Sequence, residues 1–243
     1  MIIQQLKQDL SQYANEKRKK SNEWFFKTGK GEYGEGDKFI GVAMPDIRRV
    51  VKKYVNLDFP LVSSLLASEI HEERMTGVLI LTERAKRYAR RKDLAELKNI
   101  SDFYLANRQG INNWDLVDVS CHHVLGQAIL HDIYTLDLLD GLADSGVLWD
   151  RRISMVTTFA LIRTGNIIPT LVLAEKLLGD KEDLMHKAIG WMLREAWKRK
   201  PADVEDFLME NYHQLARTTL RYAIEKMPEV QRKEFLYLYK KNV

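Results

Sequence analysis

The sequence predicts an all-α fold, a HEAT-like α-solenoid in which antiparallel helix pairs stack into a curved superhelix. Pro (5) and Gly (13) are scarce among the 243 residues, and most of the chain places apolar residues at helical spacing. Charged residues open apolar helices at intervals of 41, 37, 35 and 30 residues, near Arg74, Asp115, Arg152, Lys187 and Arg217. This drifting period, with two helices in each unit, is typical of stacked helical repeats. The alternative is an irregular helical bundle.

We interpret residues 1–243 as a single repeat domain. In chain order, helices are expected over 46–55, 61–70, 72–89, 93–106, 114–130, 134–145, 151–164, 167–178, 184–199, 204–215 and 217–227. Turn-forming residues separate many of them: Gly110, Gly141, Gly146, Gly165, Gly179 and Pro201.

One segment departs from the helical pattern. Residues 24–42, WFFKTGKGEYGEGDKFIGV, hold five of the 13 glycines and have aromatic or apolar residues at both ends. This composition predicts an insert near residues 25–41, either a short β-hairpin or an ordered Gly-rich loop. The segment lacks the GK[ST] signature of a phosphate-binding P-loop.

Composition and charge narrow the class of protein. The chain is 45% hydrophobic and 30% charged, as expected of a globular domain, with a formal net charge of +4. Basic segments at 16–20, 48–53 and 84–92 could contact phosphate, although charge runs on helices are often only solvated faces. The lone cysteine, Cys121, allows no intramolecular disulfide. Neither a signal peptide nor a long apolar run is found, so we expect a cytoplasmic protein.

The stretch GINNWDLVDVSCHH, residues 110–123, holds the most informative residues. Asn112 or Asn113 is a plausible N-cap, and Asp115 then lies in the first helical turn, where the helix dipole favours a carboxylate. Trp114 and Asp118 are four residues apart and so share one helix face. The structural alternative for Asp118 is a carboxylate satisfied by a cap or by an arginine of a neighbouring repeat.

Cations and tryptophans recur in later repeats. Arg151 and Arg152 follow Trp149 at a predicted helix start, and Lys187 opens the helix that carries Trp191. The helix dipole disfavours cations at this end, so we expect either an external anion or a carboxylate partner. Arg194 lies three residues after Trp191 and therefore shares its face.

These motifs together resemble a known family. WDLVD at 114–118, RR at 151–152 after a tryptophan, KAIGWMLRE at 187–195 and GVAMPDIRR at 41–49 look like the alkylpurine DNA glycosylases of the AlkD type, which are HEAT-like DNA alkylation repair proteins. The resemblance implies hydrolysis of the N-glycosidic bond of cationic 3-alkyladenine and 7-alkylguanine in duplex DNA. It also implies a monomer that needs no metal or organic cofactor.

The resemblance assigns roles to individual residues. Asp118 would be the catalytic carboxylate, Trp114 and Trp191 would pack against the deoxyribose, and Arg152 would hold a nearby phosphate. An alkylated purine is already a cationic leaving group, and a carboxylate suits the oxocarbenium-like transition state of its departure. We also predict DNA contacts from further cations, namely Arg151, Lys187, Arg194, Arg48, Arg49, Lys30 and Lys38.

Two features differ from the AlkD type. That type has a short connection where this chain has its insert, and polar residues where this chain has Ala43 and Met44. Relatives of the AlkF and AlkG types carry a β-hairpin at the insert and are associated with branched DNA. The sequence therefore leaves three functions open: a glycosylase, a non-catalytic binder of branched or distorted DNA, and a HEAT-type protein-interaction scaffold.

Overall fold

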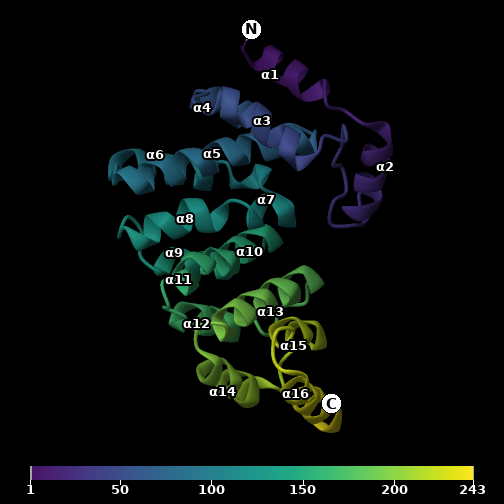
Figure 1. Ribbon diagram of the computed structural model, residues 1–243, viewed down its shortest axis with the longest axis vertical. Coiled ribbons are helices and arrows are strands. Elements are labelled where there is room, and N and C mark those ends of the chain that lie inside the picture. The colour runs from purple at the N-terminus through teal and green to yellow at the C-terminus, as the bar shows by residue number, and fades with distance from the viewer. Residues whose placement is uncertain (1, 243) are drawn as a thin grey trace. The chain divides into compact units, whose positions relative to one another are not determined.

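The protein is all-helical in a computed structural model that describes residues 2–242, with side chains to residue 238. Among the described residues the only β pairing is an isolated bridge between Lys38 and Ile70. The predicted all-α class is confirmed, and the helices form layers within each part of the chain (Figure 1), consistent with an α-solenoid. The elements in order are α1 (Ile2–Ser11), α2 (Glu16–Phe25), α3 (Met44–Tyr54), α4 (Phe59–Leu66), α5 (His71–Arg91), α6 (Leu94–Ala106), a 3₁₀ turn (Arg108–Gly110), α7 (Trp114–Asp118), α8 (Cys121–Leu130), α9 (Asp137–Ala143), α10 (Leu148–Thr157), α11 (Phe159–Arg163), α12 (Ile168–Lys176), α13 (Asp183–Trp197), α14 (Pro201–Asn211), α15 (Arg217–Ala223) and α16 (Glu229–Asn242).

The chain forms two compact units. The N-terminal unit ends at Val124 and the C-terminal unit begins at Leu125. A single repeat domain over the whole chain therefore stays a prediction, and each unit is described by itself.

Helix α5 is the centre of the N-terminal unit. It packs against α3, α4, α6 and α7, and Figure 1 shows α3 with α4 as one layer and α5 with α6 as the next. Every residue from His71 to Thr82 is buried. A helix covered on several sides has no solvent-facing stripe, so its polar side chains must find partners inside the unit.

Helix α13 has the same role in the C-terminal unit, where it packs against α10, α11, α12, α14 and α15. Its contact with α15 is very close at Gly190. A Cβ atom there would lie 2.5 Å from the carbonyl oxygen of Thr219 and 2.5 Å from the Cβ atom of Tyr222. Glycine at this position therefore sets the distance between the two helices.

Several predicted helices are divided. The helix expected over 114–130 is two helices, α7 and α8, with Val119 and Ser120 between them. The Ser120 hydroxyl contacts the carbonyl oxygens of Leu116 (2.6 Å) and Val117 (3.3 Å) and the hydroxyl of Tyr104 (2.8 Å). A serine hydroxyl that bonds to carbonyl oxygens of its own helix competes with the backbone hydrogen bonds, which explains why the helix is interrupted between α7 and α8. The helix expected over 151–164 ends in the same way at Thr158, whose hydroxyl donates to the carbonyl oxygen of Met155.

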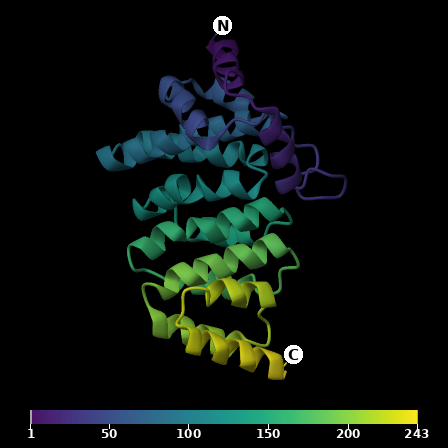
Figure 2. The same ribbon diagram turned by 45° about the vertical axis from the view of Figure 1, so that its right-hand side comes forward.

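The β-hairpin considered for the insert does not form among the described residues. Residues 26–41, which we call the Gly-rich loop, are mostly turns as far as Gly36 and then lack regular structure apart from the bridge at Lys38. Figure 2 shows this loop standing out to one side of its unit. Gly34 donates its amide to the carbonyl oxygen of Lys27, and a Cβ atom at Gly34 would lie 2.3 Å from the carbonyl oxygen of Phe26. The loop closes on itself instead of pairing as strands.

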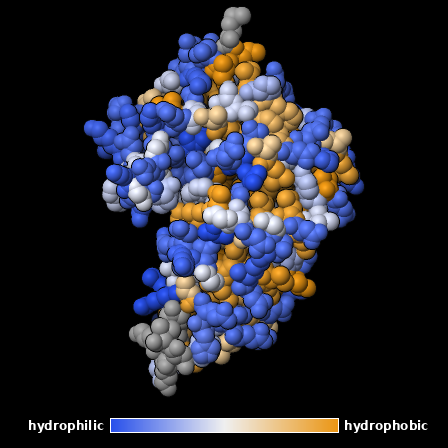
Figure 3. All heavy atoms as spheres, turned by 180° about the vertical axis from the view of Figure 1, so that it is seen from behind, coloured by the Kyte–Doolittle hydropathy of each residue, from blue (hydrophilic) through white to orange (hydrophobic). Residues whose placement is uncertain are grey.

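Figure 3 shows hydrophobic residues exposed between hydrophilic ones on the face seen from behind. Among the described residues, no helix combines the length and apolar character needed to cross a membrane.

Candidate functional site

Helix α7 begins at Trp114 because Asn113 caps it. The Asn113 side-chain oxygen accepts the amide of Trp114 (2.8 Å), and its side-chain nitrogen donates to Asp37 of the Gly-rich loop (3.1 Å). Asn113 is completely buried. Of the two caps that the sequence allowed, Asn113 is the one that forms, and it also links α7 to the loop.

The two acids of α7 lie in different environments. Asp115 accepts from the imidazole of His71 (2.9 Å) and from the amide of Leu116 (2.9 Å). Asp118 is the last residue of the helix, is half-buried, and lies one turn after Trp114 on the same face. Asp115 is therefore part of a structural ion pair with α5.

The end of α2 and the Gly-rich loop supply aromatic rings that pack on Trp114. Phe26 stacks on the indole at 5.3 Å between ring centroids, and Phe25 meets it edge-on at 5.9 Å. Phe26 also stacks on Phe39 at 5.1 Å, and Phe39 stacks on His71 at 4.6 Å. One face of Trp114 is thus the end of an aromatic column that runs through the loop to α5.

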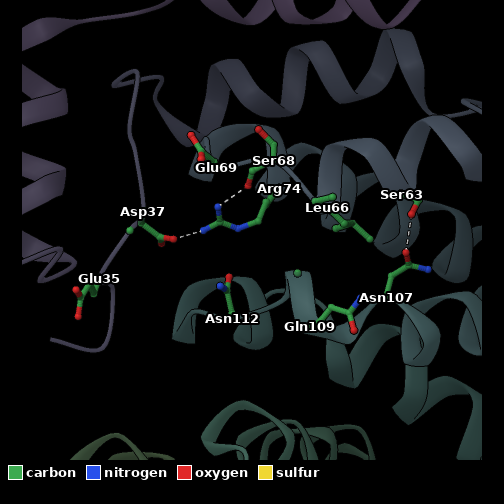
Figure 4. Close-up of a pocket in the computed structure, with 13 residues that line it drawn as sticks. Glu35, Asp37, Ser63, Leu66, Ser68, Glu69, Arg74, Asn107, Gln109 and Asn112 are labelled. Atoms are coloured by element: carbon green, nitrogen blue, oxygen red, sulfur yellow. Dashed lines mark hydrogen bonds and ion pairs between the residues drawn. The ribbon is translucent and has the colours of Figure 1, made fainter. Parts of the chain in front are cut away.

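A buried charge cluster, formed by Asp37, His71, Arg74, Asn113 and Asp115, joins the loop to both helices. The Asp37 carboxylate contacts Nδ1 of His71 at 3.1 Å and accepts from the Arg74 guanidinium at 2.5 Å. Figure 4 shows this Asp37–Arg74 pair, with Arg74 also bonded to Ser68. Two carboxylates and two cations balance the charge of the cluster, which is the condition for burying it.

The cluster shifts the pKa values of its members. Burial disfavours the His71 imidazolium, but the neighbouring carboxylates of Asp115 and Asp37 outweigh burial and raise the pKa of His71 to about 9. Burial also opposes ionisation of Asp37, yet the hydrogen bond from His71 and the charge of Arg74 lower the pKa of Asp37 below its usual value. His71 is therefore a cation at neutral pH.

The next two residues of the first turn of α5 hold other segments. Glu72 accepts three backbone amides at the end of the Gly-rich loop, from Ile40 (3.1 Å), Gly41 (2.8 Å) and Val42 (3.3 Å). Glu73 pairs with Lys7 of α1 at 2.8 Å. The sequence signal for this turn was HEER at 71–74, four polar residues at the start of an apolar helix, and its role was not predicted from the sequence.

A cavity of about 340 Å³ lies beside the buried charge cluster (Figure 4). Asp37 and Arg74 line one side, and Ser63 with Asn107, joined by a 2.7 Å hydrogen bond, line the other. Among the described residues that line it, neither Trp114 nor Asp118 is found. The cavity is therefore separate from the exposed side of α7.

The predicted cations of the C-terminal unit have protein partners. Arg151 pairs with Asp180 at 2.6 Å and Lys187 pairs with Asp183 at 2.7 Å, which is the carboxylate alternative stated for these helix starts. Arg194 pairs with Glu195 and Glu225.

Two of the four residues to which the resemblance assigns roles at the reaction site lie in this unit. Arg152 is only 4% exposed and donates to the carbonyl oxygen of Leu184. Trp191 is half-buried on α13, with its ring 6.0 Å from that of Phe159. The other two, Trp114 and Asp118, belong to the N-terminal unit.

The remaining predicted cations lie on the surface of the N-terminal unit. Arg48, Arg49 and Lys30 are exposed, and Arg49 pairs with Asp46 at 2.7 Å. Lys38 is exposed and pairs with Glu69 at 2.5 Å. Within the described part of the chain, no group of three or more His, Cys, Asp or Glu side chains is arranged to hold a metal ion. DNA contacts from these cations stay a prediction.

The layered helices make this an all-α protein, consistent with an α-solenoid. A family model described as DNA alkylation repair enzyme matches residues 6–227, and the chain belongs to this family. Family membership makes it a DNA repair enzyme whose partner is DNA.

A solved structure, a predicted DNA alkylation repair enzyme from Enterococcus faecalis, shares the fold with a TM-score of 0.67. It is 16% identical in sequence, and the match covers 89% of this chain and 97% of that one. No curated protein matches the chain.

Proposed function

We propose that this protein is a DNA glycosylase that hydrolyses the N-glycosidic bond of cationic alkylated purines, 3-alkyladenine and 7-alkylguanine, in duplex DNA. The observation that carries the proposal is the difference between the two acids of α7. Asp115 is held by His71 of α5, and Asp118 is half-buried one turn after Trp114 on the same helix face. Asp118 is therefore the carboxylate of this motif that we assign to the reaction.

The proposed chemistry needs only groups that this helix carries. As the bond from C1′ to the purine breaks, its electron pair moves to the cationic ring, which leaves as a neutral alkylpurine. The sugar becomes an oxocarbenium-like cation that the Asp118 carboxylate stabilises. Water then adds to C1′, and Asp118 accepts its proton. The base needs no general acid because alkylation has already made it a leaving group.

Trp114 supports this assignment through its fixed orientation. Phe26 stacks on one face of the indole and Asn113 caps the turn that carries it, so the ring has little freedom to rotate. A rigid aromatic face stabilises a passing cation by about 1–2 kcal/mol when water is excluded. The roles that the resemblance implies for Trp191 and Arg152, contact with the deoxyribose and with a phosphate, are part of the proposal.

The test is release of methylated purines from methylated duplex DNA by the purified protein. Asp118→Asn should lower release by about 100-fold or more, the range of a lost catalytic carboxylate, while binding to the same DNA persists. Asp115→Asn is the matched control on the same helix, and it should lower the free energy of unfolding because His71 loses one of its two carboxylate partners. Release at the wild-type rate by Asp118→Asn would remove Asp118 from the mechanism.

A second candidate function is recognition of branched or distorted DNA without catalysis. It is supported by the Gly-rich loop, whose Phe26 packs on Trp114 and whose Lys30 is exposed. Deleting the loop is a poor test because it would remove Asp37 from the buried charge cluster. The loop must be altered at its lysines instead.

The sharper variant is Lys27→Asn with Lys30→Ala, because Asn tolerates the positive φ of 51° at Lys27. Lys92→Asn is a matched control, since Lys92 is also exposed and has a φ of 57°. If the loop selects branched DNA, the double variant should lose the preference for a four-way junction over linear duplex, and the control should keep it. A preference unchanged in both variants would reject the loop as the recognition element.

A further inference from the structure

Helix α2 is unusual because none of its residues is buried. Its last turn carries Trp24, which is 81% exposed, next to Phe25, which is 54% exposed. Solvent-exposed tryptophan of this extent is uncommon in a folded monomer and marks surfaces that bind something. The stability of α2 must therefore come from its ends.

Both ends of α2 are held firmly in place. At its start, Asn15 caps the helix by accepting the amide of Arg18 (2.9 Å), and Arg18 donates to the carbonyl oxygen of Gly41 (3.1 Å). A Cβ atom at Gly41 would lie 2.1 Å from the carbonyl oxygen of Asn15, so the chain passes very close at this point. At its other end, Phe25 and Phe26 pack on Trp114. The outward face of α2 is presented by a fixed backbone.

That outward face is cationic. Lys17, Lys20 and Trp24 are spaced three and four residues apart, so they form one stripe, and all three are exposed. From residue 16 to residue 30 the chain has six Lys or Arg and two Glu, a net charge of +4, which equals the formal charge of the whole protein. Within the described residues, the ammonium groups of Lys17 and Lys20 have no ion-pair partner. We call these three residues the α2 stripe.

We infer that the α2 stripe binds single-stranded nucleic acid. Trp24 stacks on an unpaired base, and Lys17 and Lys20 neutralise phosphates of the same strand. A bare indole beside ammonium groups is the combination that single-strand binding surfaces use, because every base has a π face and every nucleotide has a phosphate. Paired bases keep both faces stacked, so duplex DNA offers Trp24 no comparable contact. The stripe is about 10 Å long and covers only a few nucleotides.

The α2 stripe lies next to the candidate site of the same unit along the chain. Trp24 is followed directly by Phe25 and Phe26, the rings that pack on Trp114. A strand held on the α2 stripe thus leads toward α7. The inference does not depend on catalysis by Asp118, because an oligonucleotide without methylated bases is sufficient to test it.

The experiment measures fluorescence anisotropy of a labelled oligothymidine and of a duplex of equal length, titrated with the full chain. Trp24→Ala should weaken oligothymidine binding about ten-fold, within the range of one lost base stack, and Trp24→Phe should retain most of it. Duplex binding should change little. Lys17→Ala with Lys20→Ala should lower the salt dependence of oligothymidine binding by about 1.4 in log–log slope. The charge control is Lys226→Ala with Lys233→Ala in the C-terminal unit, two lysines that pair with Glu225 and Glu229.

Three results would overturn the inference: no oligothymidine binding at low salt, equal binding by Trp24→Ala and wild type, or an equal loss of duplex binding. Vesicles that contain anionic lipid are a further arm, and loss of vesicle binding alone in Trp24→Ala would assign the stripe to a membrane surface instead. Because Trp24 is exposed, its variants should fold normally, which circular dichroism checks. Methylpurine release by Trp24→Ala reports separately on the proposed glycosylase.

Discussion

Two helix segments with similar sequences of charged residues have opposite environments. The first turn of α5, HEER at 71–74, is entirely buried, whereas EKRKK at 16–20 in α2 has no buried residue. The difference lies in their partners. Each side chain of the α5 turn meets an opposite charge or a row of backbone amides, while Lys17 and Lys20 of α2 are exposed to solvent. A run of charged residues in the sequence therefore does not predict whether the run is buried unless the partners of its side chains are known.

The largest effect should come from removing one partner of the buried charge cluster. Asp37→Ala leaves the cations of His71 and Arg74 without their shared carboxylate. We expect the free energy of unfolding to fall by about 3–5 kcal/mol, as for other broken buried ion pairs. Chemical denaturation followed by circular dichroism measures it.

The adjacent Lys38→Ala is the control for Asp37→Ala. Lys38 belongs to an ion pair with Glu69 in which both side chains are more than half exposed. Its removal should leave the unfolding midpoint almost unchanged, because solvent screens such pairs. Equal effects from the two substitutions would show that the cluster is not what ties the loop to α5.

The next largest effect should be a loss of stability of the folded protein as pH rises. The pKa of His71 is raised from 6.5 to about 9 in the folded state. Its contribution to the free energy of unfolding is therefore fully present below pH 6.5 and is lost as pH rises through 9. Wild type should therefore lose up to a few kcal/mol of stability between pH 6.5 and 9 relative to His71→Gln. Parallel denaturation curves at pH 6, 7, 8 and 9 measure the difference.

The contribution of Asp37 to the free energy of unfolding has the opposite dependence on pH. Its pKa is lowered, so its contribution is present above about pH 4 and is lost as pH falls through the folded-state pKa. The cluster should consequently be strongest between about pH 4 and 6.5. A difference between wild type and His71→Gln that does not vary with pH would mean that His71 is not charged in the folded protein.

These contacts also explain what the sequence could and could not predict. Helices with an apolar stripe, such as α13, were found from periodicity, but α2 has no buried face and so gives no such signal. The buried charge cluster was missed because its partners are distant in sequence: Asp37 is 34 residues from His71 and Asp115 is 44 residues away. Motif resemblance picked out α7, but not Phe25 and Phe26, whose rings pack on Trp114.

A smaller effect is expected from the aromatic contact between the loop and α7. Phe26→Ala removes the ring that stacks on Trp114 and on Phe39. Since Phe26 is only partly buried, we expect about 1–2 kcal/mol of lost stability, less than for a core phenylalanine. Phe26→Leu keeps most of the apolar volume without the stacking geometry.

The decisive measurement for Phe26 is the rate of methylpurine release at saturating DNA. If the stack orients Trp114, Phe26→Ala and Phe26→Leu should both lower this rate, although Phe26→Leu is the more stable variant. Rates that instead follow stability would indicate that the ring only fills space.

The smallest effect on stability should come from the α2 stripe. Lys17→Ala with Lys20→Ala removes two exposed ammonium groups that have no ion-pair partner among the described residues, and alanine is the better helix former. The unfolding midpoint should therefore stay the same or rise slightly, in contrast to Asp37→Ala. Because the fold is unaffected, any loss of oligonucleotide binding in this variant is a direct effect of the lysines. A clear drop in the midpoint would mean that α2 is held by these side chains, and the contrast between α2 and α5 would no longer hold.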